Sequence, residues 1–261
     1  MSPLETPPRP GGASVFRRVR IEPAYKAVSA EIERSILEGA IQPGMPLPTE
    51  QELADRFGVH RSTVREAIRQ VEQEGLLQRR EGRRLFVTLP GLYDLAPRTA
   101  RLLILQQITF QELWDVAITL EPAAARLAAQ AASPADLDAL AINMEATAAL
   151  TDATPSAENH VALVALDVEF HALVSRASGN RALMLAREPV SLLYNPALLQ
   201  LHERLPQSRA RNLQAHRQIL GALQQRDATG AETWTRKHMN DFRRGFAMAG
   251  LDMAAPLVQP Q

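Results

Sequence analysis

The stretch LPTEQELADRFGVHRSTVREAIRQVEQEGLL, residues 47–77, decides the fold of the N-terminal part of the chain. Thr49, followed three residues later by Glu52, forms a capping-box pattern that predicts the start of a short helix. Gly58 suits a sharp backbone bend, and a second helix is predicted over 61–74. Two helices joined by a tight turn that contains glycine predict a helix-turn-helix.

The residues on either side of this stretch complete a small domain over 21–89. An amphipathic helix is predicted over 24–39, because apolar residues recur there at steps of three and four. Residues 78–87, QRREGRRLFV, are typical of two short strands around a turn at Gly82. Three helices and a β-hairpin together predict a winged helix-turn-helix.

Strand patterns end near Pro90, and the rest of the chain is typical of helices. The composition agrees, because alanine and leucine are plentiful and lose little on entering a helix. We expect a mainly α protein in which an all-α helical bundle, residues 98–249, follows a linker over 90–97. Residues 1–20 are predicted to form a disordered tail and 250–261 a frayed one. The predicted helices of this part are 97–107, 110–131, 134–150, 157–178, 180–203, 207–226 and 228–248.

Composition excludes some classes of protein and leaves others open. The chain has 261 residues with 29 basic and 29 acidic side chains, so its net charge alone does not argue for nucleic acid. It has no cysteine, which rules out disulfides and thiolate metal sites and agrees with a reducing, cytoplasmic location. The sequence has no stretch of eighteen uninterrupted apolar residues, so no membrane span is predicted.

The second helix of the helix-turn-helix carries side chains suited to DNA. Arginines at 61, 65 and 69 share one helix face, and arginine can pair bidentately with guanine. The hairpin behind this helix adds further arginines for a wing that reaches the DNA backbone or minor groove. A solvated helix face remains the alternative interpretation. The residues that this pattern predicts to contact DNA are His60, Arg61, Ser62, Thr63, Arg65, Arg69, Arg83 and Arg84, and the family resemblance described below adds Gln51 and Gly82.

The helical part contains a candidate metal site. Asp167 and His171 lie one helical turn apart and can therefore bind one ion, while His216 and His238 belong to later predicted helices. Three imidazoles and one carboxylate suit Zn²⁺, Ni²⁺ or Mn²⁺. The alternative is a salt-bridged Asp–His pair with two unrelated histidines.

Residues 22–89 resemble the GntR family of bacterial transcription regulators. The resemblance implies that Arg61 and Arg65 contact DNA, with His60, Ser62 and Thr63 beside them and Gly82 at the wing tip. Two positions depart from the family pattern: Gln51 stands where arginine is usual, and Arg84 where a second wing glycine is usual. The positions that carry the resemblance are Leu47, Pro48, Glu50, Leu53, Ala54, Val59, Arg61, Val64, Arg65, Glu66, Ala67, Gly75, Phe86 and Val87.

Residues 98–245 resemble the FCD effector domain of the FadR-like branch of that family. The matching runs are LEPAAARLAAQ (120–130), DVEFHALVSRASGN (167–180) and HRQILGAL (216–223). The resemblance implies a helical bundle that holds a metal and binds a small carboxylate effector, such as a sugar acid or hydroxy acid. By position, the implied metal ligands are Asp167, His171, His216 and His238.

One position of the effector domain departs from its relatives. Ala117 stands where many of them carry an arginine suited to a carboxylate. Either another residue supplies the positive charge, with Arg126 and Arg209 as the candidates, or the effector is of a different kind.

Three hypotheses about function follow. The first is a ligand-responsive transcription regulator, which binds operator DNA as a homodimer and is not an enzyme. The second is a metal-dependent enzyme that uses the Asp/His cluster, but no general base lies at a suggestive spacing. The third is a helical part that only dimerises.

Overall fold

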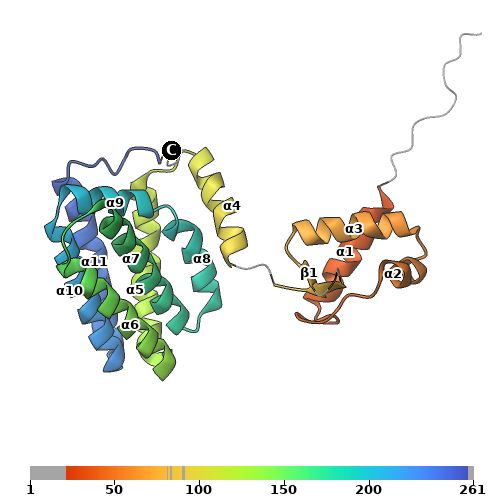
Figure 1. The fold of residues 1–261 in the computed structure, drawn as a ribbon, viewed down its shortest axis with the longest axis horizontal. Coiled ribbons are helices and arrows are strands. Elements are labelled where there is room, and N and C mark those ends of the chain that lie inside the picture. The colour runs from red at the N-terminus through yellow and green to blue at the C-terminus, as the bar shows by residue number, and fades with distance from the viewer. Residues whose placement is uncertain (1–21, 81, 83, 90–91, 258–261) are drawn as a thin grey trace, which may run out of the picture. The chain divides into compact units, whose positions relative to one another are not determined.

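The computed structural model describes residues 22–80, 82, 84–89 and 92–257. The chain divides between Pro90 and Gly91 into two compact units (Figure 1). Each unit has its own buried apolar core. A winged helix-turn-helix followed by an all-α bundle is therefore confirmed as the fold.

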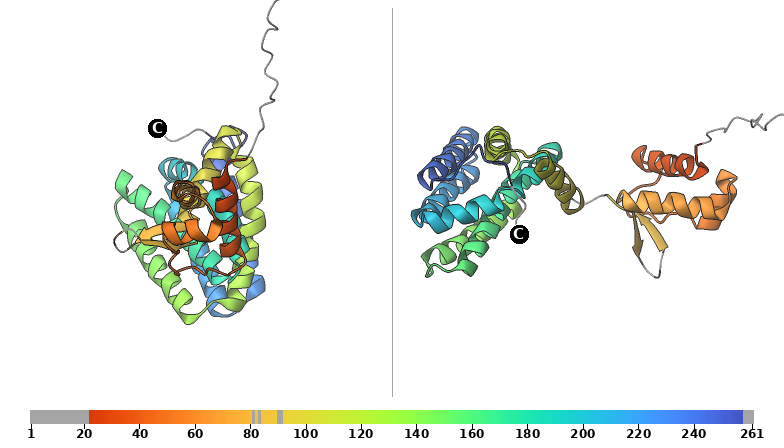
Figure 2. Two further views of the ribbon diagram at one scale, coloured as in Figure 1. Left: turned by 90° about the vertical axis from the view of Figure 1, so that its right-hand side faces the viewer. Right: turned by 90° about the horizontal axis from the view of Figure 1, so that it is seen from above.

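The N-terminal unit packs three helices against a two-stranded hairpin. Val64, Ile68 and Val71 were predicted to lie on one face of the second helix of the helix-turn-helix, and all three are fully buried there. They pack against the apolar side chains of the helix over residues 24–37. The hairpin extends away from the helices of this unit (Figure 2). The elements are α1 (Ala24–Leu37), α2 (Glu50–Phe57), α3 (Arg61–Gln73), β1 (Leu77–Arg80) and β2 (Arg84–Val87).

Local hydrogen bonds set the start and end of α2. The Thr49 hydroxyl accepts from the backbone N–H of Glu52, and the Glu52 carboxylate accepts from the backbone N–H of Thr49, so the predicted capping box is confirmed. Gly58 ends the helix at a φ of 65°, a left-handed conformation that favours glycine. This bend sets the direction from which α3 leaves the turn.

The hairpin pairs Leu77 with Val87 and Arg80 with Arg84 in antiparallel register. Leu77, Leu85 and Val87 are buried in the core of the unit, whereas Arg79, Arg80 and Arg84 are exposed. Gly82 lies between the strands at a φ of 73°. The wing therefore buries its apolar face and presents a basic one.

The C-terminal unit is a helical bundle. Its long helices touch in the cyclic order α5, α11, α10, α6 and α7, and α8 and α9 pack against α7 (Figures 1 and 2). The helices are α4 (Leu92–Leu105), α5 (Phe110–Ala131), α6 (Pro134–Asp152), α7 (Ala157–Ala177), α8 (Arg181–Ser191), α9 (Asn195–Arg204), α10 (Gln207–Gln224) and α11 (Ala228–Met248).

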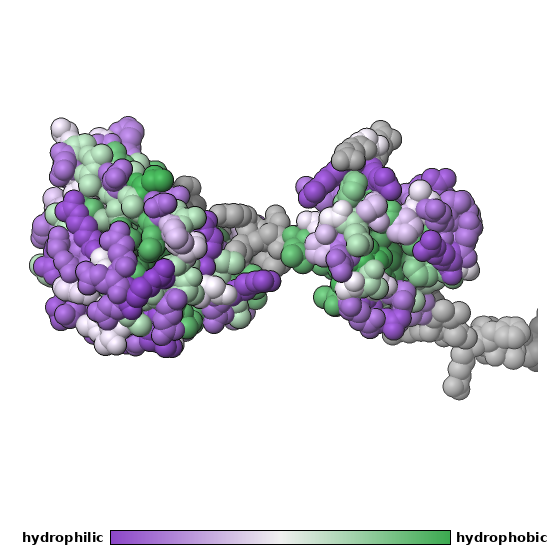
Figure 3. Space-filling view, turned by 90° about the horizontal axis from the view of Figure 1, so that it is seen from below, coloured by the Kyte–Doolittle hydropathy of each residue, from purple (hydrophilic) through white to green (hydrophobic). Residues whose placement is uncertain are grey.

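Small residues on α5 allow this packing. Ala125, Ala128 and Ala129 are completely buried, and they face larger side chains such as Phe170 and Leu223 in the main core cluster. Such alternation of small and large residues fills a core without voids. The face of the unit seen in Figure 3 is mostly hydrophilic, with some hydrophobic residues between the polar ones.

The structure corrects three expectations. The helix predicted over 180–203 is wrong, because a turn over 192–194 separates α8 from α9. Pro196 explains the break: it has no N–H to donate to the carbonyl of Leu192. The linker expected over 90–97 is instead helical from Leu92, and Pro97 costs α4 only one hydrogen bond in its first two turns.

The third correction concerns the C-terminal segment, which we expected to fray over 250–261. Leu251, Met253 and Leu257 pack against the apolar cluster around Phe110. The backbone N–H of Leu257 donates to the carbonyl of Ile108 at 2.9 Å. Burial of these side chains therefore holds the segment as far as Leu257, while 258–261 and the expected tail over 1–20 lie outside the described residues.

Among the residues that the structure describes, no helix is both long enough and apolar enough to cross a membrane.

Candidate DNA-binding surface and metal centre

Helix α3 exposes the three arginines that the sequence places on one face. Arg61, Arg65 and Arg69 each leave about half or more of the side chain open to solvent. Ser62 beside them is exposed and Thr63 is half-buried. The start of α3 therefore presents guanidinium and hydroxyl groups together, which suits contacts to both phosphates and base edges.

Glu50, the first residue of α2, holds two of these arginines. Its Oε2 accepts from Nε of Arg61 at 2.9 Å and from Nη2 of Arg65 at 3.0 Å. The hydrogen bond from Arg65 lowers the pKa of Glu50 below its usual range, which outweighs the opposing effect of partial burial. Glu50 thus holds the two guanidinium groups side by side at the start of α3.

His60 has a structural role that was not predicted from the sequence. It is the N-cap of α3, and its Nδ1 accepts from the backbone N–H of Ser62 at 3.2 Å. The same nitrogen lies 2.7 Å from the Ser62 hydroxyl. His60 therefore fixes the first turn of α3.

The remaining predicted DNA-contacting residues lie at the rim of this unit. Gln51 donates to Asp55 on the same helix at 2.9 Å and is exposed. Arg84 is exposed at the start of β2, with its guanidinium 5.9 Å from the centre of the Phe86 ring. Gly82 is at the hairpin turn, and Arg83 lies outside the described residues.

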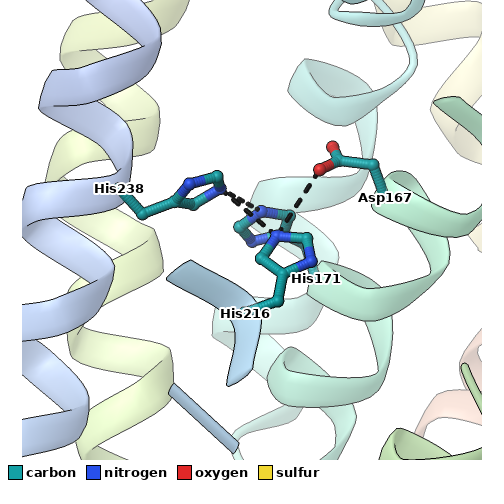
Figure 4. Close-up of side chains that lie close together, drawn as sticks. All are labelled: Asp167, His171, His216 and His238. Carbon is teal, nitrogen blue, oxygen red and sulfur yellow. Dashed lines mark hydrogen bonds and ion pairs between the residues drawn. The ribbon is translucent and has the colours of Figure 1, made fainter. Parts of the chain in front are cut away.

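In the helical unit, the four candidate metal ligands come together from three helices (Figure 4). Asp167 and His171 lie on α7, His216 on α10 and His238 on α11. Nε2 of His238 is 3.2 Å from Nε2 of His171 and 3.3 Å from Nε2 of His216. Oδ1 of Asp167 is 3.5 Å from Nε2 of His216, and the donor atoms all lie within 4.8 Å of one another.

The distances of 3.2, 3.3 and 3.5 Å are close to those between ligands of a single metal ion. Two atoms at a zinc–nitrogen distance from one ion stand about 2.8 to 3.4 Å apart when the bond angle is 90–110°. The three imidazoles are buried, and His216 is completely so. A buried set of nitrogen and carboxylate ligands suits Zn²⁺, Ni²⁺ or Mn²⁺, so the residues present fit the implied group.

Neighbouring side chains orient the cluster. Nδ1 of His171 lies 3.0 Å from Oε2 of Glu121, which directs Nε2 of His171 toward the other histidines. Asn212 donates from Nδ2 to Oδ1 of Asp167 at 2.7 Å. Phe170 stacks on the His216 ring with centroids 3.9 Å apart. Carboxylates that hold the far nitrogen of a histidine are common around protein-bound metals.

The pKa values of the three histidines are shifted in different directions. Burial lowers the pKa of His238 to about 4 and that of His216 well below its usual range, so both are neutral at pH 7. Burial also opposes the charged form of His171, but Glu121 outweighs it and raises the pKa. Neutral imidazoles are the form that binds a metal, so His216 and His238 need lose no proton to do so.

A cavity of about 50 Å³ adjoins this cluster. Asp167, His171 and His238 face it on one side, and its other walls are largely apolar. The cavity therefore offers a ligand direct access to the cluster.

Glu121 also lines this cavity. Burial opposes the charge on Glu121, yet Arg187 and His171 together lower its pKa to about 2, so it is a carboxylate throughout the physiological range.

Sequence reasoning missed the arginine of this cavity. Ala117 lines it, at the position where the resemblance leads one to expect an arginine, and Arg187 of α8 is the arginine that lines it instead. The two candidates named from sequence lie elsewhere: Arg126 pairs with Glu232, and Arg209 donates to the carbonyl of Thr151. No local pattern marks Arg187, because only packing of α8 brings it to the cavity.

Glu121 and Asn212 were also missed, although each leaves a weak local signal. Glu121 belongs to the LEP run, and Asn212 stands one helical turn before His216. A carboxylate or an amide at such a position can serve many other roles. Neither therefore predicts contact with the cluster without the fold.

Comparison with known proteins agrees with both units. Residues 24–87 match the family described as "Bacterial regulatory proteins, gntR family", and residues 112–241 match the FCD domain. The chain is 30% identical over 227 residues to the Uxu operon transcriptional regulator of Escherichia coli (strain K12), covering 84% of this chain and 85% of that protein. It is 27% identical over 231 residues to the Glc operon transcriptional activator of the same strain, covering 86% and 89%.

A solved structure shares the fold. Streptococcus agalactiae GntR superposes with a TM-score of 0.59 at 24% identity, covering 84% of this chain and 99% of that one. The relatives are transcriptional regulators and not enzymes. The chain is a DNA-binding transcription regulator that belongs to the GntR family, with an FCD domain behind its winged helix-turn-helix.

Proposed function

We propose that this regulator senses a small carboxylate through a divalent metal held by Asp167, His171, His216 and His238. The observation that carries the proposal is the convergence of three Nε2 atoms and one carboxylate oxygen beside a cavity. When bound, the metal supplies a Lewis-acidic centre that attracts a carboxylate oxygen. Zn²⁺, Ni²⁺ and Mn²⁺ are the candidates.

The chain's own residues have distinct parts in this sensor. Glu121 and Asn212 orient His171 and Asp167, as their hydrogen bonds indicate. The apolar walls of the cavity exclude water, which strengthens electrostatic attraction for an acid. Arg187 places a buried positive charge in the same cavity.

On the DNA side, we propose that α3 enters the major groove. Arg61, Arg65 and Arg69 contact base edges or phosphates, with Ser62, Thr63 and the His60-capped helix start beside them. Gln51 and the wing residues Gly82, Arg83 and Arg84 contact the flanking backbone or minor groove. A cytoplasmic homodimer places two such helices on the half-sites of an operator.

Effector binding then changes the affinity for DNA. Such coupling requires that the acid bind with different affinity to the DNA-competent and DNA-incompetent states of the dimer. Reciprocity follows: operator DNA changes the affinity for the acid by the same factor.

Metal analysis of the purified chain tests the sensor directly. After loading with zinc, nickel or manganese and exhaustive dialysis, we expect roughly stoichiometric metal in the wild type and little in His216→Ala. His202→Gln is the matched control, because His202 is equally buried but lies outside the cluster. Equal metal content in the wild type and His216→Ala would overturn the proposed site.

A thermal-shift screen of small carboxylic acids tests the ligand class. An acid that binds only the folded protein raises its apparent unfolding temperature by mass action. We expect that rise in metal-loaded wild type and its loss in the metal-free protein. Equal shifts with and without metal would contradict carboxylate binding through the cluster.

A further inference from the structure

We propose that Arg187 and Tyr194 form a second anchor in the cavity, which binds an uncharged oxygen at the far end of a short monocarboxylic acid. This inference rests on the proposed function, in which the carboxylate end of the acid meets the metal cluster. Both residues line the cavity that Asp167, His171 and His238 face. The anchor therefore discriminates among acids by the group at the end opposite the carboxylate.

Arg187 has donor capacity that the protein does not use. Its side chain is only 6% exposed, and its Nε donates to Oε1 of Glu121. Among the residues that the structure describes, its buried Nη1 has no hydrogen-bond partner, and Oε2 of Glu188 lies 3.7 Å from it. Buried donors in native proteins are nearly always satisfied, so this N–H points to an acceptor that a ligand brings.

Tyr194 presents a second unused group in the same cavity. Its hydroxyl oxygen is buried and has no hydrogen-bond partner in the described part of the chain. Contacts hold the ring in place, with centroids 5.0 Å from Phe110 and 5.8 Å from Phe242. A fixed phenol can donate to a ligand oxygen and also accept from a ligand hydroxyl. Two buried polar groups without partners thus belong to side chains that line one cavity.

The buried charges indicate that the acid is uncharged at the end opposite its carboxylate. Two carboxylates, Glu121 and Glu188, already compensate the positive charge of Arg187, and Asp167 faces the cavity as a further negative charge. The site therefore has no excess positive charge beyond what a divalent ion brings, and one carboxylate of the acid uses that charge. A second carboxylate would bury an uncompensated negative charge, which is strongly unfavourable. Hydroxy and oxo acids fit better than dicarboxylates.

The size of the cavity limits the length of the acid. Its volume is about 50 Å³, and apolar side chains such as Ala117, Val190 and Leu198 line it between the polar groups. A short apolar link between the carboxylate and the far oxygen matches these walls. Short, unbranched acids match this space best.

Three acids of three carbons each test the anchor: propionate, 3-hydroxypropionate and malonate. They differ only at the carbon farthest from the first carboxylate, which is a methyl, a hydroxymethyl or a second carboxylate group. Binding to the zinc-loaded full-length chain is measured by isothermal titration calorimetry. We expect 3-hydroxypropionate to bind about tenfold more tightly than propionate, as one or two buried hydrogen bonds imply, and malonate to bind more weakly than 3-hydroxypropionate.

Tyr194→Phe removes only the unpartnered hydroxyl and therefore leaves the fold intact. It should abolish most of the preference for 3-hydroxypropionate over propionate and leave propionate binding unchanged. Arg187→Lys keeps a positive charge beside Glu121 and removes the free Nη1, with the same expected loss. Tyr25→Phe, in the N-terminal unit, is the matched control and should keep the preference.

The outcomes separate the two proposals. Equal affinity of the wild type for propionate and 3-hydroxypropionate overturns the second anchor and leaves carboxylate sensing standing. A preference that survives in Tyr194→Phe and Arg187→Lys also overturns the anchor. Failure of all three acids to bind zinc-loaded protein overturns both the anchor and the proposed function.

Discussion

Asn212 donates a hydrogen bond from Nδ2 to Oδ1 of Asp167 at 2.7 Å, joining α10 to α7. The same oxygen lies 3.5 Å from Nε2 of His216. Because Asn212 and His216 are one helical turn apart, one face of α10 supplies both a candidate metal ligand and the donor that orients another. The geometry of the cluster therefore depends on residues that do not themselves bind metal.

Removing this donor should weaken metal binding. In Asn212→Ala, the Asp167 carboxylate loses the bond that aims it, and the loss of such an orienting partner typically costs about 10- to 100-fold in metal affinity. Competition of the purified chain with a chromogenic zinc chelator measures the affinity.

Asn143→Ala is the control for this change. Asn143 is a buried asparagine of the same bundle that donates to Glu169 and to the carbonyl of Leu166 on α7, but to none of the four cluster side chains. We expect it to lower stability to a similar degree while keeping wild-type zinc affinity. Equal zinc affinities in the two variants would remove Asn212 from the metal site.

Arginine removal on α3 should reduce specific DNA binding. We expect Arg61→Ala and Arg65→Ala each to cost about 1–3 kcal/mol of binding to a duplex selected by the wild type, because an arginine contact to a base is lost. Fluorescence anisotropy at fixed salt measures this. Arg236→Ala, an exposed and ion-paired arginine of α11, is the control. A loss no larger than that of the control would contradict α3 as the recognition helix.

Glu50 should contribute to the sequence specificity of DNA binding. Its carboxylate holds Arg61 and Arg65 in one arrangement and also repels phosphates. In Glu50→Gln we expect unrelated DNA to bind a few-fold more tightly, while the ratio of specific to non-specific affinity falls. The same anisotropy measurement on selected and scrambled duplexes gives both values.

Glu232→Gln removes an equal charge from the helical unit and serves as the control for this effect. If it changed the affinity for scrambled DNA as much as Glu50→Gln does, the effect would come from net charge alone. An unchanged specificity ratio in Glu50→Gln would show that the arginines are positioned without it.

The free energy of unfolding should fall on acidification, in part through His202. Burial lowers the pKa of His202 to about 4, from 6.5 for an ordinary histidine. Between these pH values the unfolded chain binds a proton that the folded chain does not, so stability is lost as the pH falls from 6.5 toward 4. The slope for one such group is at most about 1.4 kcal/mol per pH unit.

His202→Gln should remove this contribution. Urea unfolding at several pH values, with a chelator present so that metal does not compete with protons, gives the slope for each protein. We expect the variant to lose stability more gradually than the wild type between pH 6.5 and 4. Identical slopes would mean that His202 is protonated in the folded chain.

Features of the N-terminal unit were predictable because they are local. The capping box of Thr49 and Glu52, the bend at Gly58 and the buried stripe of Val64, Ile68 and Val71 all depend on residues within one or two helical turns. The part of His60 as an N-cap is local too. It was missed because histidine is not among the preferred capping residues.

Features of the helical unit were harder to predict from the sequence because they depend on how its helices pack. Spacing placed Asp167 and His171 on one face, but only family resemblance joined His216 and His238 to them. Pro196 broke a predicted helix, which changed how α8 approaches the bundle. Arg187 reaches the cavity through that approach, so no pattern in the sequence indicated it.

One measurement tests the central claim most directly: the affinity of the full-length chain for its selected duplex, with and without 3-hydroxypropionate, in zinc-loaded and chelator-treated protein. We expect the acid to change the affinity at least about fivefold in zinc-loaded wild type, within the usual range of allosteric coupling. We expect no change in the chelated wild type or in His216→Ala. An acid effect that is equal with and without zinc, or absent from both, would contradict metal-dependent sensing.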